Sequence, residues 1–213
     1  MIRETITYEW FTIFMVVGLV FITAAKILYT NRFMDFIGVF GNSKYLKIYT
    51  KDQKFIDFFD TLLFINLVIG LSIFGYLAYL TLEPTQTFEL HLFFKFILAL
   101  TAISIIKILI ERLVGSLFEI DKTIDAYLFQ KTSYKNFSGF VLLIVNGLLL
   151  YTIQPTKIVL LIAVSLLVLI NLIGFITSFK MHQKTVGHNI FYLILYLCAL
   201  EISPYIILYK TFV

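Results

Sequence analysis

FYLILYLCALEISP, residues 191–204, is the stretch that decides how this chain folds. It lies in an apolar run over 190–210, and about 20 apolar residues in a helix are enough to cross the hydrocarbon core of a bilayer. Glu201 then falls near the middle of the membrane, where a carboxylate is usually protonated or paired with a cation. Pro204 removes a backbone donor from the same helix, so we expect it to shape the helix there.

The chain is far more apolar than a soluble protein. Of its 213 residues, 60% are hydrophobic and 14% charged, and its mean hydropathy is +0.94, whereas roughly a quarter of residues are charged in soluble domains. We therefore expect an all-α polytopic membrane bundle, with residues 1–213 forming a single integral membrane domain. The lone Cys198 excludes an internal disulfide and a cysteine-rich metal site.

Five more apolar runs are long enough, or nearly so, to be membrane spans. The six predicted transmembrane helices cover about 10–29, 61–82, 90–110, 137–153, 157–179 and 190–210. Only a short turn at 154–156 separates the fourth span from the fifth, so these two are expected to be antiparallel neighbours.

Between the third and fourth spans, apolar residues recur at helical spacing over about 113–129. They are Leu113, Leu117, Ile120, Ile124 and Leu128, and Glu119, Lys122 and Asp125 fall on other faces. This pattern predicts one amphipathic helix on the cytoplasmic surface of the membrane. A helical continuation of the third span into solvent is the alternative.

Lysine and arginine are distributed unevenly between the loops. Loops one, three and five hold five, four and two of them, whereas the termini and the other loops hold Arg3, Lys157 and Lys210. Because positively charged loops stay in the cytoplasm, we expect loops one, three and five to be cytoplasmic and both termini periplasmic, in a bacterial inner membrane. This orientation accounts for the net charge of +4 without a nucleic-acid partner.

Lys107 is the best single partner for Glu201. Side chains on a helix lean toward its N-terminus, and the third and sixth spans run in opposite directions, so these two lean toward one another. Such a pair braces the bundle or receives a partner helix, although an intramembrane carboxylate also marks ion paths and proton relays. The asparagines of the spans are candidate accessory groups that bond between helices; they are Asn66, Asn146 and Asn171.

No catalytic, cofactor-binding or metal-binding motif is evident in the sequence. The spans contain neither Gly-x-Ser-x-Gly nor His-Glu-x-x-His, and His182 and His188 have no other ligand types nearby. A lipid-modifying enzyme would place its site near Glu111, Arg112 and the amphipathic helix. Those charges, however, lie where a solvated helix end would place them.

The C-terminal residues also carry a family resemblance. The block consists of Phe191-Tyr192, Leu195-Tyr196-Leu197-Cys198, Leu200-Glu201-Ile202, Pro204 and Tyr209-Lys210, with weaker support from Lys107, Gly115 and Phe118. On these residues the chain resembles a domain-of-unknown-function family of multi-pass inner-membrane proteins from Bacteroidota. The resemblance implies a polytopic envelope protein without an assigned activity and supplies no catalytic residues. The chain has Asn146 in a region where that family is associated with a proline.

We therefore expect a non-enzymatic integral membrane protein that is a subunit or assembly factor of a bacterial cell-envelope complex. Its expected partners are the lipid bilayer and other membrane or envelope proteins, with no cofactor. The alternative is a small proton-coupled membrane transporter that uses Glu201 as its proton carrier.

Overall fold

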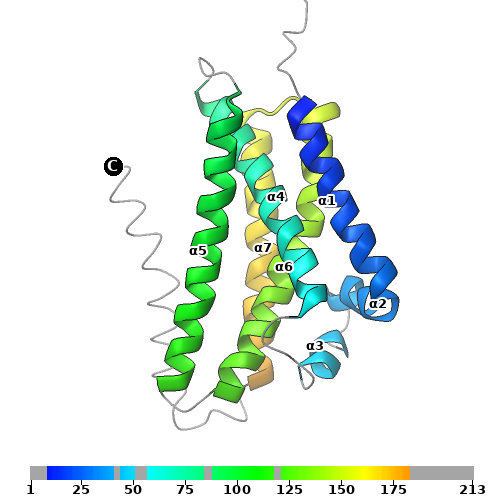
Figure 1. The fold of residues 1–213 in the computed structure, drawn as a ribbon, viewed down its shortest axis with the longest axis vertical. Helices are drawn as coiled ribbons and strands as arrows, with labels where there is room; N and C mark the ends of the chain where they lie inside the picture. The colour runs from blue at the N-terminus through cyan, green and yellow to red at the C-terminus, as the bar shows by residue number, and fades with distance from the viewer. Residues whose placement is uncertain (1–8, 41–43, 51–56, 84–87, 118–120, 183–213) are drawn as a thin grey trace, which may run out of the picture.

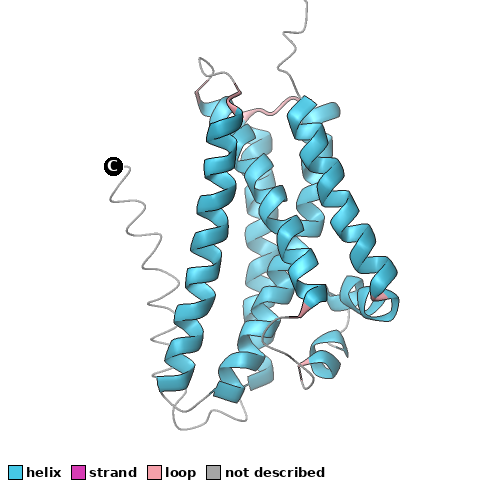
Figure 2. Cartoon of the chain, viewed as in Figure 1, coloured by secondary structure: helices cyan, strands magenta, loops and turns pink. Residues whose placement is uncertain are grey.

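The computed structural model describes residues 9–40, 44–50, 57–83, 88–117 and 121–182, and the elements in these ranges are helices (Figures 1 and 2). They are α1 (Glu9–Leu28), α2 (Thr30–Ile37), the short 3-10 helix η1 (Gly38–Phe40), α3 (Lys44–Tyr49), α4 (Phe58–Leu82), α5 (Leu90–Leu117), α6 (Asp121–Tyr151) and α7 (Lys157–His182). The predicted all-α class is confirmed for this part of the chain.

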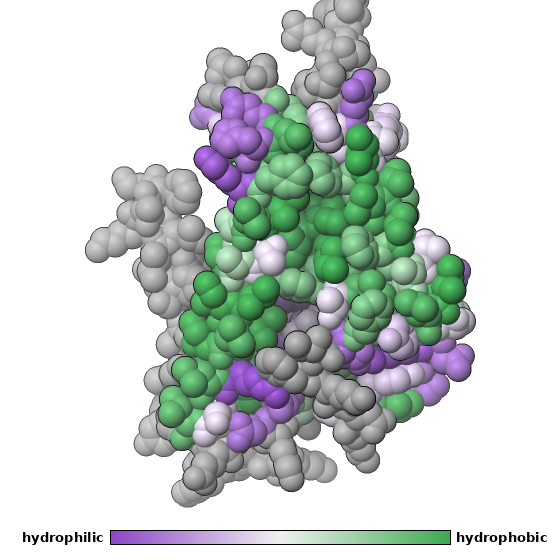
Figure 3. All heavy atoms as spheres, in the orientation of Figure 1, coloured by the Kyte–Doolittle hydropathy of each residue, from purple (hydrophilic) through white to green (hydrophobic). Residues whose placement is uncertain are grey.

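Five of these helices are long and apolar enough to cross a membrane. The candidate spans are Glu9–Leu28, Phe58–Leu82, Leu90–Leu117, Ile124–Tyr151 and Lys157–Thr177. They overlap the first five predicted spans, and the predicted sixth, 190–210, lies outside the described residues. Figure 3 shows apolar side chains over the middle of the visible face, with polar side chains gathered toward its two ends.

Helices α4 and α6 form the centre of the bundle. In the most apolar stretch of α4, 67% of the residues are buried, against 6% in α5. Helix α4 packs against α1, α5, α6 and α7, and α6 packs against α5 and α7. Because α5 is buried only near its ends, at Phe93, Glu111, Val114 and Gly115, it lies at the edge of the described bundle.

The close approach of α4 and α6 depends on a glycine. A Cβ atom on Gly139 of α6 would lie 2.7 Å from the Cα atom of Leu67 on α4. Any larger residue at position 139 would therefore push the two helices apart. About two turns further along α6, the Nδ2 atom of Asn146 donates a hydrogen bond of 2.9 Å to the Gly70 carbonyl oxygen. Small residues and interhelical hydrogen bonds are the usual means of packing apolar helices tightly in a membrane.

Aromatic side chains fill the bundle toward both ends. One core cluster surrounds Phe11, Tyr76 and Phe93, whose rings meet at centroid distances of 5.7 to 6.0 Å. The other surrounds Phe36 and Phe59 and includes residues of α1, α2, α3, α4 and α6. This second cluster holds α2 and α3 against the end of the bundle where α1 ends and α4 begins (Figure 1).

The region 113–129 differs from its prediction as one amphipathic surface helix. Residues 113–117 complete α5, and residues 121–129 begin α6. Ile124 and Leu128 are buried, whereas Leu113 and Leu117 are 61% and 72% exposed, so only the part of the predicted apolar face that lies on α6 packs inside the protein. The same burial explains why α6 begins well before residue 137, the predicted start of the fourth span.

Candidate functional site

Charged side chains lie between the helices at the end of the bundle where α2 and α3 pack against it. Helix α2 and η1 bury Phe33, Phe36 and Val39, and α3 buries Tyr45 and Leu46. Tyr45 stacks on Phe129 of α6, with ring centroids 5.6 Å apart and an interplanar angle of 28°. These apolar contacts fix the backbone of α2 and α3, and they therefore position the charged side chains between them.

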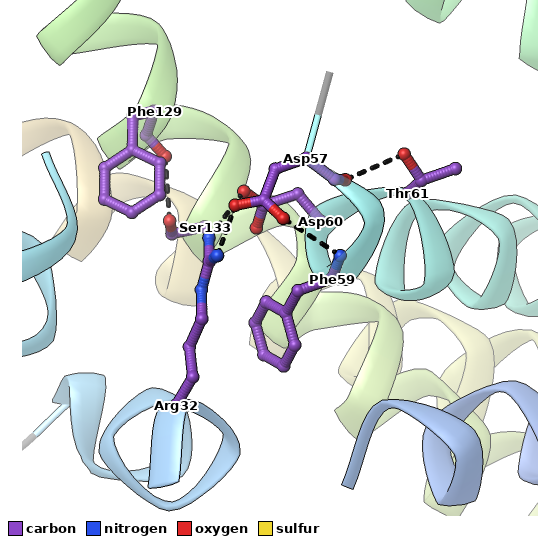
Figure 4. A network of polar contacts seen from close by, with 7 residues as sticks. All are labelled: Arg32, Asp57, Phe59, Asp60, Thr61, Phe129 and Ser133. Atoms are coloured by element: carbon purple, nitrogen blue, oxygen red, sulfur yellow. Dashed lines mark hydrogen bonds and ion pairs between the residues drawn. The ribbon is translucent and has the colours of Figure 1, made fainter. Parts of the chain in front are cut away.

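Arg32 of α2 forms the centre of a charge cluster with two carboxylates of the α4 N-terminus. Its Nη1 atom donates to Asp57 Oδ2, and its Nη2 atom donates to Asp60 Oδ2 at 3.0 Å (Figure 4). The three side chains are 14%, 20% and 16% exposed. We call Arg32, Asp57 and Asp60 the arginine cluster.

Local backbone structure places both aspartates. Asp57 is the N-cap of α4, and its Oδ1 atom accepts a hydrogen bond of 3.1 Å from the Phe59 backbone N–H. Asp60 follows in the first turn. Residues three apart on a helix share a face, so both carboxylates are directed at one guanidinium, and acidic side chains are favoured at this helix end.

Aromatic rings enclose the guanidinium. The Arg32 Cζ atom lies 4.6 Å from the ring centroid of Phe59 and 5.1 Å from that of Tyr49. Arginine is suited to this setting because its planar group pairs with carboxylates and stacks on rings at the same time. At the outer side, Lys44 Nζ lies 3.1 Å from Asp35 Oδ1 in a more exposed pair.

One carboxylate oxygen of this region, Asp60 Oδ1, is buried without a hydrogen-bond partner among the described residues. The buried Tyr45 hydroxyl lies close to Arg32 and Ser133. Burial, followed by the charge of Asp60, raises the pKa of Tyr45 above its ordinary range, so its hydroxyl stays neutral.

A second charge cluster joins α5 to α6. Lys131 Nζ donates to Glu111 Oε1 at 2.7 Å, and the two side chains are 13% and 2% exposed. The Lys131 ammonium also lies 5.3 Å from the Tyr127 ring centroid. Nearby, Arg112 pairs with Asp125 at 3.4 Å with more exposure. We call Glu111 and Lys131 the lysine pair.

The three asparagines expected to be accessory groups occupy different environments. Asn146 is fully buried and bonds from α6 to the Gly70 carbonyl on α4. Asn66 is 2% exposed, and its Nδ2 atom has no partner among the described residues. Asn171 is exposed and donates to the Leu167 carbonyl at 2.8 Å and to Ser138 Oγ at 3.2 Å.

The proposed intramembrane pair is described on one side only. Lys107 lies on α5 with intermediate exposure, whereas Glu201 and Pro204 lie outside the described residues. Their approach therefore remains a prediction. Glu111, which sequence reasoning assigned to a solvated helix end, is instead 2% exposed and paired with Lys131.

Sequence reasoning missed the arginine cluster. It counted Arg32 as one more basic residue of a cytoplasmic loop, because its carboxylate partners lie 25 and 28 positions further along the chain. A local signal was present. Asp57 and Asp60 have the spacing of an N-cap and first-turn acid directly before an apolar helix.

The chemistry available in the arginine cluster is charge pairing and proton binding. In the described part of the chain, no group of three or more histidine, cysteine or acidic residues is placed to hold a metal ion. One guanidinium, two carboxylates and a buried phenol can share protons and hold helices together.

Comparison with known proteins identifies a family. No curated protein and no solved structure matches the chain. The family described as Domain of unknown function (DUF4271) matches residues 11–212, which include every helix described above except the first two residues of α1. The chain therefore belongs to the DUF4271 family.

Proposed function

We propose that this protein is a non-enzymatic integral membrane protein of the bacterial inner membrane that serves as a subunit or assembly factor of a cell-envelope complex. The observation that carries the proposal is the packing of α2, η1 and α3 against the bundle end. The arginine cluster and the aromatic core hold these elements in place. An attachment of this kind suits a platform on which another protein docks.

The surface of this platform has the composition of a docking site. Its outward side chains include large apolar residues, namely Met34, Ile37, Phe40 and Ile48, which are 40% to 61% exposed. Lys44 and Lys47 are exposed beside them. Apolar area with adjacent positive charge is complementary to a partner segment that carries apolar and acidic residues, so we commit to a membrane or envelope protein of that chemistry.

Photo-crosslinking tests the platform directly. A photoreactive amino acid placed at Met34, Ile37 or Phe40 is expected to capture one protein species at a stoichiometric yield in cells, and mild-detergent purification to retain it. The matched control is Leu169 on α7, which is equally apolar and 59% exposed. Capture of lipid alone at all three positions would refute the proposal.

The membrane orientation belongs to the same proposal. Six spans, with 190–210 as the last, place both termini in the periplasm and put α2 and α3 on the cytoplasmic side. Reporter fusions that fluoresce only in the cytoplasm or are active only in the periplasm test each end. A cytoplasmic C-terminus would contradict the sixth span.

We also propose that Glu201 and Lys107 form the predicted intramembrane pair. The middle of α5, residues 94–110, contains no buried residue in the described structure, and a carboxylate beside a lysine offsets the cost of either charge in the bilayer. The native Cys198 provides the test, because an Ile103→Cys substitution on α5 introduces a second thiol at a similar depth. A disulfide is expected between them. Val20→Cys on α1, 60% exposed, is the control.

A proton-coupled transporter is the second candidate. The observation that favours it is the set of buried amide atoms without a partner among the described residues, on Asn66, Asn136 and Asn146. Polar groups inside a membrane bundle often belong to a substrate or proton path. Glu201→Gln is then expected to abolish a pH-dependent flux in proteoliposomes without lowering the melting temperature. A bracing Glu201 predicts the opposite pattern, with partial rescue by Lys107→Met.

A further inference from the structure

The amide group of Asn136 on α6 is buried with neither of its polar atoms bonded. The side chain is 0% exposed, and its Oδ1 and Nδ2 atoms both lack a hydrogen-bond partner among the described residues. An amide that is removed from water without hydrogen bonds is costly, so buried polar groups are nearly always bonded to protein or to ordered water. Asn136 therefore offers one acceptor and one donor group to a small polar ligand.

The contact between α4 and α6 shows where this amide lies. Gly139 follows Asn136 by about one turn on the same face of α6, and a Cβ atom on Gly139 would lie 2.7 Å from the Leu67 Cα atom on α4. Further along both helices, a Cβ atom on Gly70 would lie 3.3 Å from the Leu142 Cβ atom, so α4 and α6 run in the same direction (Figure 1). Asn136 therefore faces α4 just before the two backbones meet.

Two further polar groups belong to the same contact. Asp60 precedes Leu67 by about two turns and so shares the face of α4 that is directed at α6; its Oδ1 atom is buried without a partner in the described ranges. Ser133, which is 1% exposed, precedes Asn136 by about one turn on α6. The Tyr45 hydroxyl lies close to Ser133 and interacts electrostatically with Asp60, which places these two side chains in one neighbourhood (Figure 4).

Water fits these groups in chemistry and in reach. An ordered internal water makes about two to four hydrogen bonds, and the amide, the Ser133 hydroxyl oxygen and the carboxylate oxygen together offer donors and acceptors. Ser133 and Asn136 are separated by about 4.5 Å along the helix axis, and one water between two partners spans about 5.5 Å. A neutral amide with both a donor and an acceptor to satisfy suits water better than an ion.

We propose that ordered water binds the Asn136 amide inside the α4–α6 contact and connects it to Ser133 and Asp60. This water enters from the bundle end where α2 and α3 lie. Further inward, the backbones of Gly139 and Leu67 are in close contact and leave no space for a solvent molecule between them. The water site is therefore closed toward the middle of the bundle, and it does not depend on which partner docks at α2 and α3.

Radiolytic labelling of the full-length protein in nanodiscs tests for this water. X-ray radiolysis converts bound water into hydroxyl radicals that oxidise the nearest side chains, which mass spectrometry then locates. Leu63 lies between Asp60 and Leu67 on the same face of α4 and is 0% exposed, so only internal water can lead to its oxidation. Leu77 on the same helix is the matched control, because it is 2% exposed and packs in the aromatic cluster around Tyr76.

Leu63 is expected to be oxidised several times faster than Leu77 in the wild type. Asn136→Leu fills the water site with an apolar group and should lower the Leu63 rate to that of Leu77, whereas Asn136→Ser retains a polar group and should keep Leu63 reactive. Equal rates in the wild type would overturn the proposal, because the amide would then be dry or bonded by a protein group outside the described residues. An unchanged Leu63 rate in Asn136→Leu would place the water elsewhere and would also overturn it.

The direction of the change in melting temperature provides an independent test. If the Asn136 amide were dry and unbonded, Asn136→Leu would raise the melting temperature, because it removes a buried polar group that has no partner. A hydrated amide predicts a lower melting temperature, because Ser133 and Asp60 lose the water that bonds them. Asn171→Leu, which replaces an exposed amide, is the control. A rise in the melting temperature of Asn136→Leu would contradict the water site, and each variant must elute as the native species on gel filtration.

Discussion

The arginine cluster and the lysine pair differ in charge balance, although both connect helices in a buried setting. The arginine cluster places two carboxylates on one guanidinium and attaches α2 and α3 to α4. The lysine pair places one carboxylate on one ammonium and connects α5 to α6. Loss of one carboxylate leaves a second carboxylate on the guanidinium of the arginine cluster, whereas in the lysine pair it removes the carboxylate that Lys131 contacts.

Loss of the guanidinium should have the largest effect. Arg32→Met leaves two carboxylates buried without a cation, and we expect it to lower the free energy of unfolding by about 3–5 kcal/mol. Chemical unfolding in detergent, followed by circular dichroism, measures this. Arg32→Lys should be intermediate, because an ammonium cannot reach both carboxylates in the same fork. A loss no larger than that of the exposed Lys47→Met would contradict a buried cluster.

The cost of removing one carboxylate should differ clearly between the lysine pair and the arginine cluster. Glu111→Gln removes the carboxylate that Lys131 Nζ contacts at 2.7 Å and should cost about 3–5 kcal/mol. Asp60→Asn should cost less, about 1.5–3 kcal/mol, because Asp57 still pairs with Arg32 and one charge-assisted hydrogen bond is lost. Paired unfolding curves of the two variants make the comparison. Adding Lys131→Met to Glu111→Gln should restore part of the loss, and equal losses in the two carboxylate variants would remove the distinction.

Gly139→Ala tests the apolar contact between α4 and α6, which lies apart from both clusters. The added methyl group would lie 2.7 Å from the Leu67 Cα atom, so we expect a cost of about 1–3 kcal/mol from overpacking. Thermal unfolding at two pH values provides the measurement. The loss should be the same at both, and a pH-dependent loss would mean that this contact and the arginine cluster are coupled.

Asn146→Leu is expected to have the smallest effect. It removes the hydrogen bond to the Gly70 carbonyl oxygen, and interhelical hydrogen bonds in membranes contribute about 0.6 kcal/mol on average. Its melting temperature, compared with that of Asn171→Leu on an exposed face, measures the contribution. A loss as large as that of Glu111→Gln would show that a neutral hydrogen bond stabilises this bundle as much as a buried ion pair.

The long apolar helices were predictable because burial in lipid requires continuous apolar sequence. The runs over 10–29, 61–82, 90–110 and 157–179 overlap α1, α4, α5 and α7. The start of α6 was not predictable in the same way. Its first half carries Gln130, Ser133 and Asn136, which read as a loop in sequence but are buried inside the structure.

The sequence shows the individual charged residues of the candidate site but not how they pair. The acidic residues of the α4 N-terminus follow the local rule for helix starts, and the sequence shows a basic residue at Arg32. Which carboxylates meet that arginine depends on the fold, because the partners lie 25 and 28 positions away. Glu111 illustrates the same point, since the partner that buries it is on the next helix.

The sequence by itself determined that the described part of the chain is all-helical and that several of its helices are long and apolar enough to span a membrane, because hydropathy and helical length are local properties. Only the tertiary structure decided that α4 and α6 are central, that α2 and α3 are attached to the bundle end, and that two carboxylates meet one guanidinium. Charge balance in a buried cluster depends on which residues are brought together, and that is a property of packing.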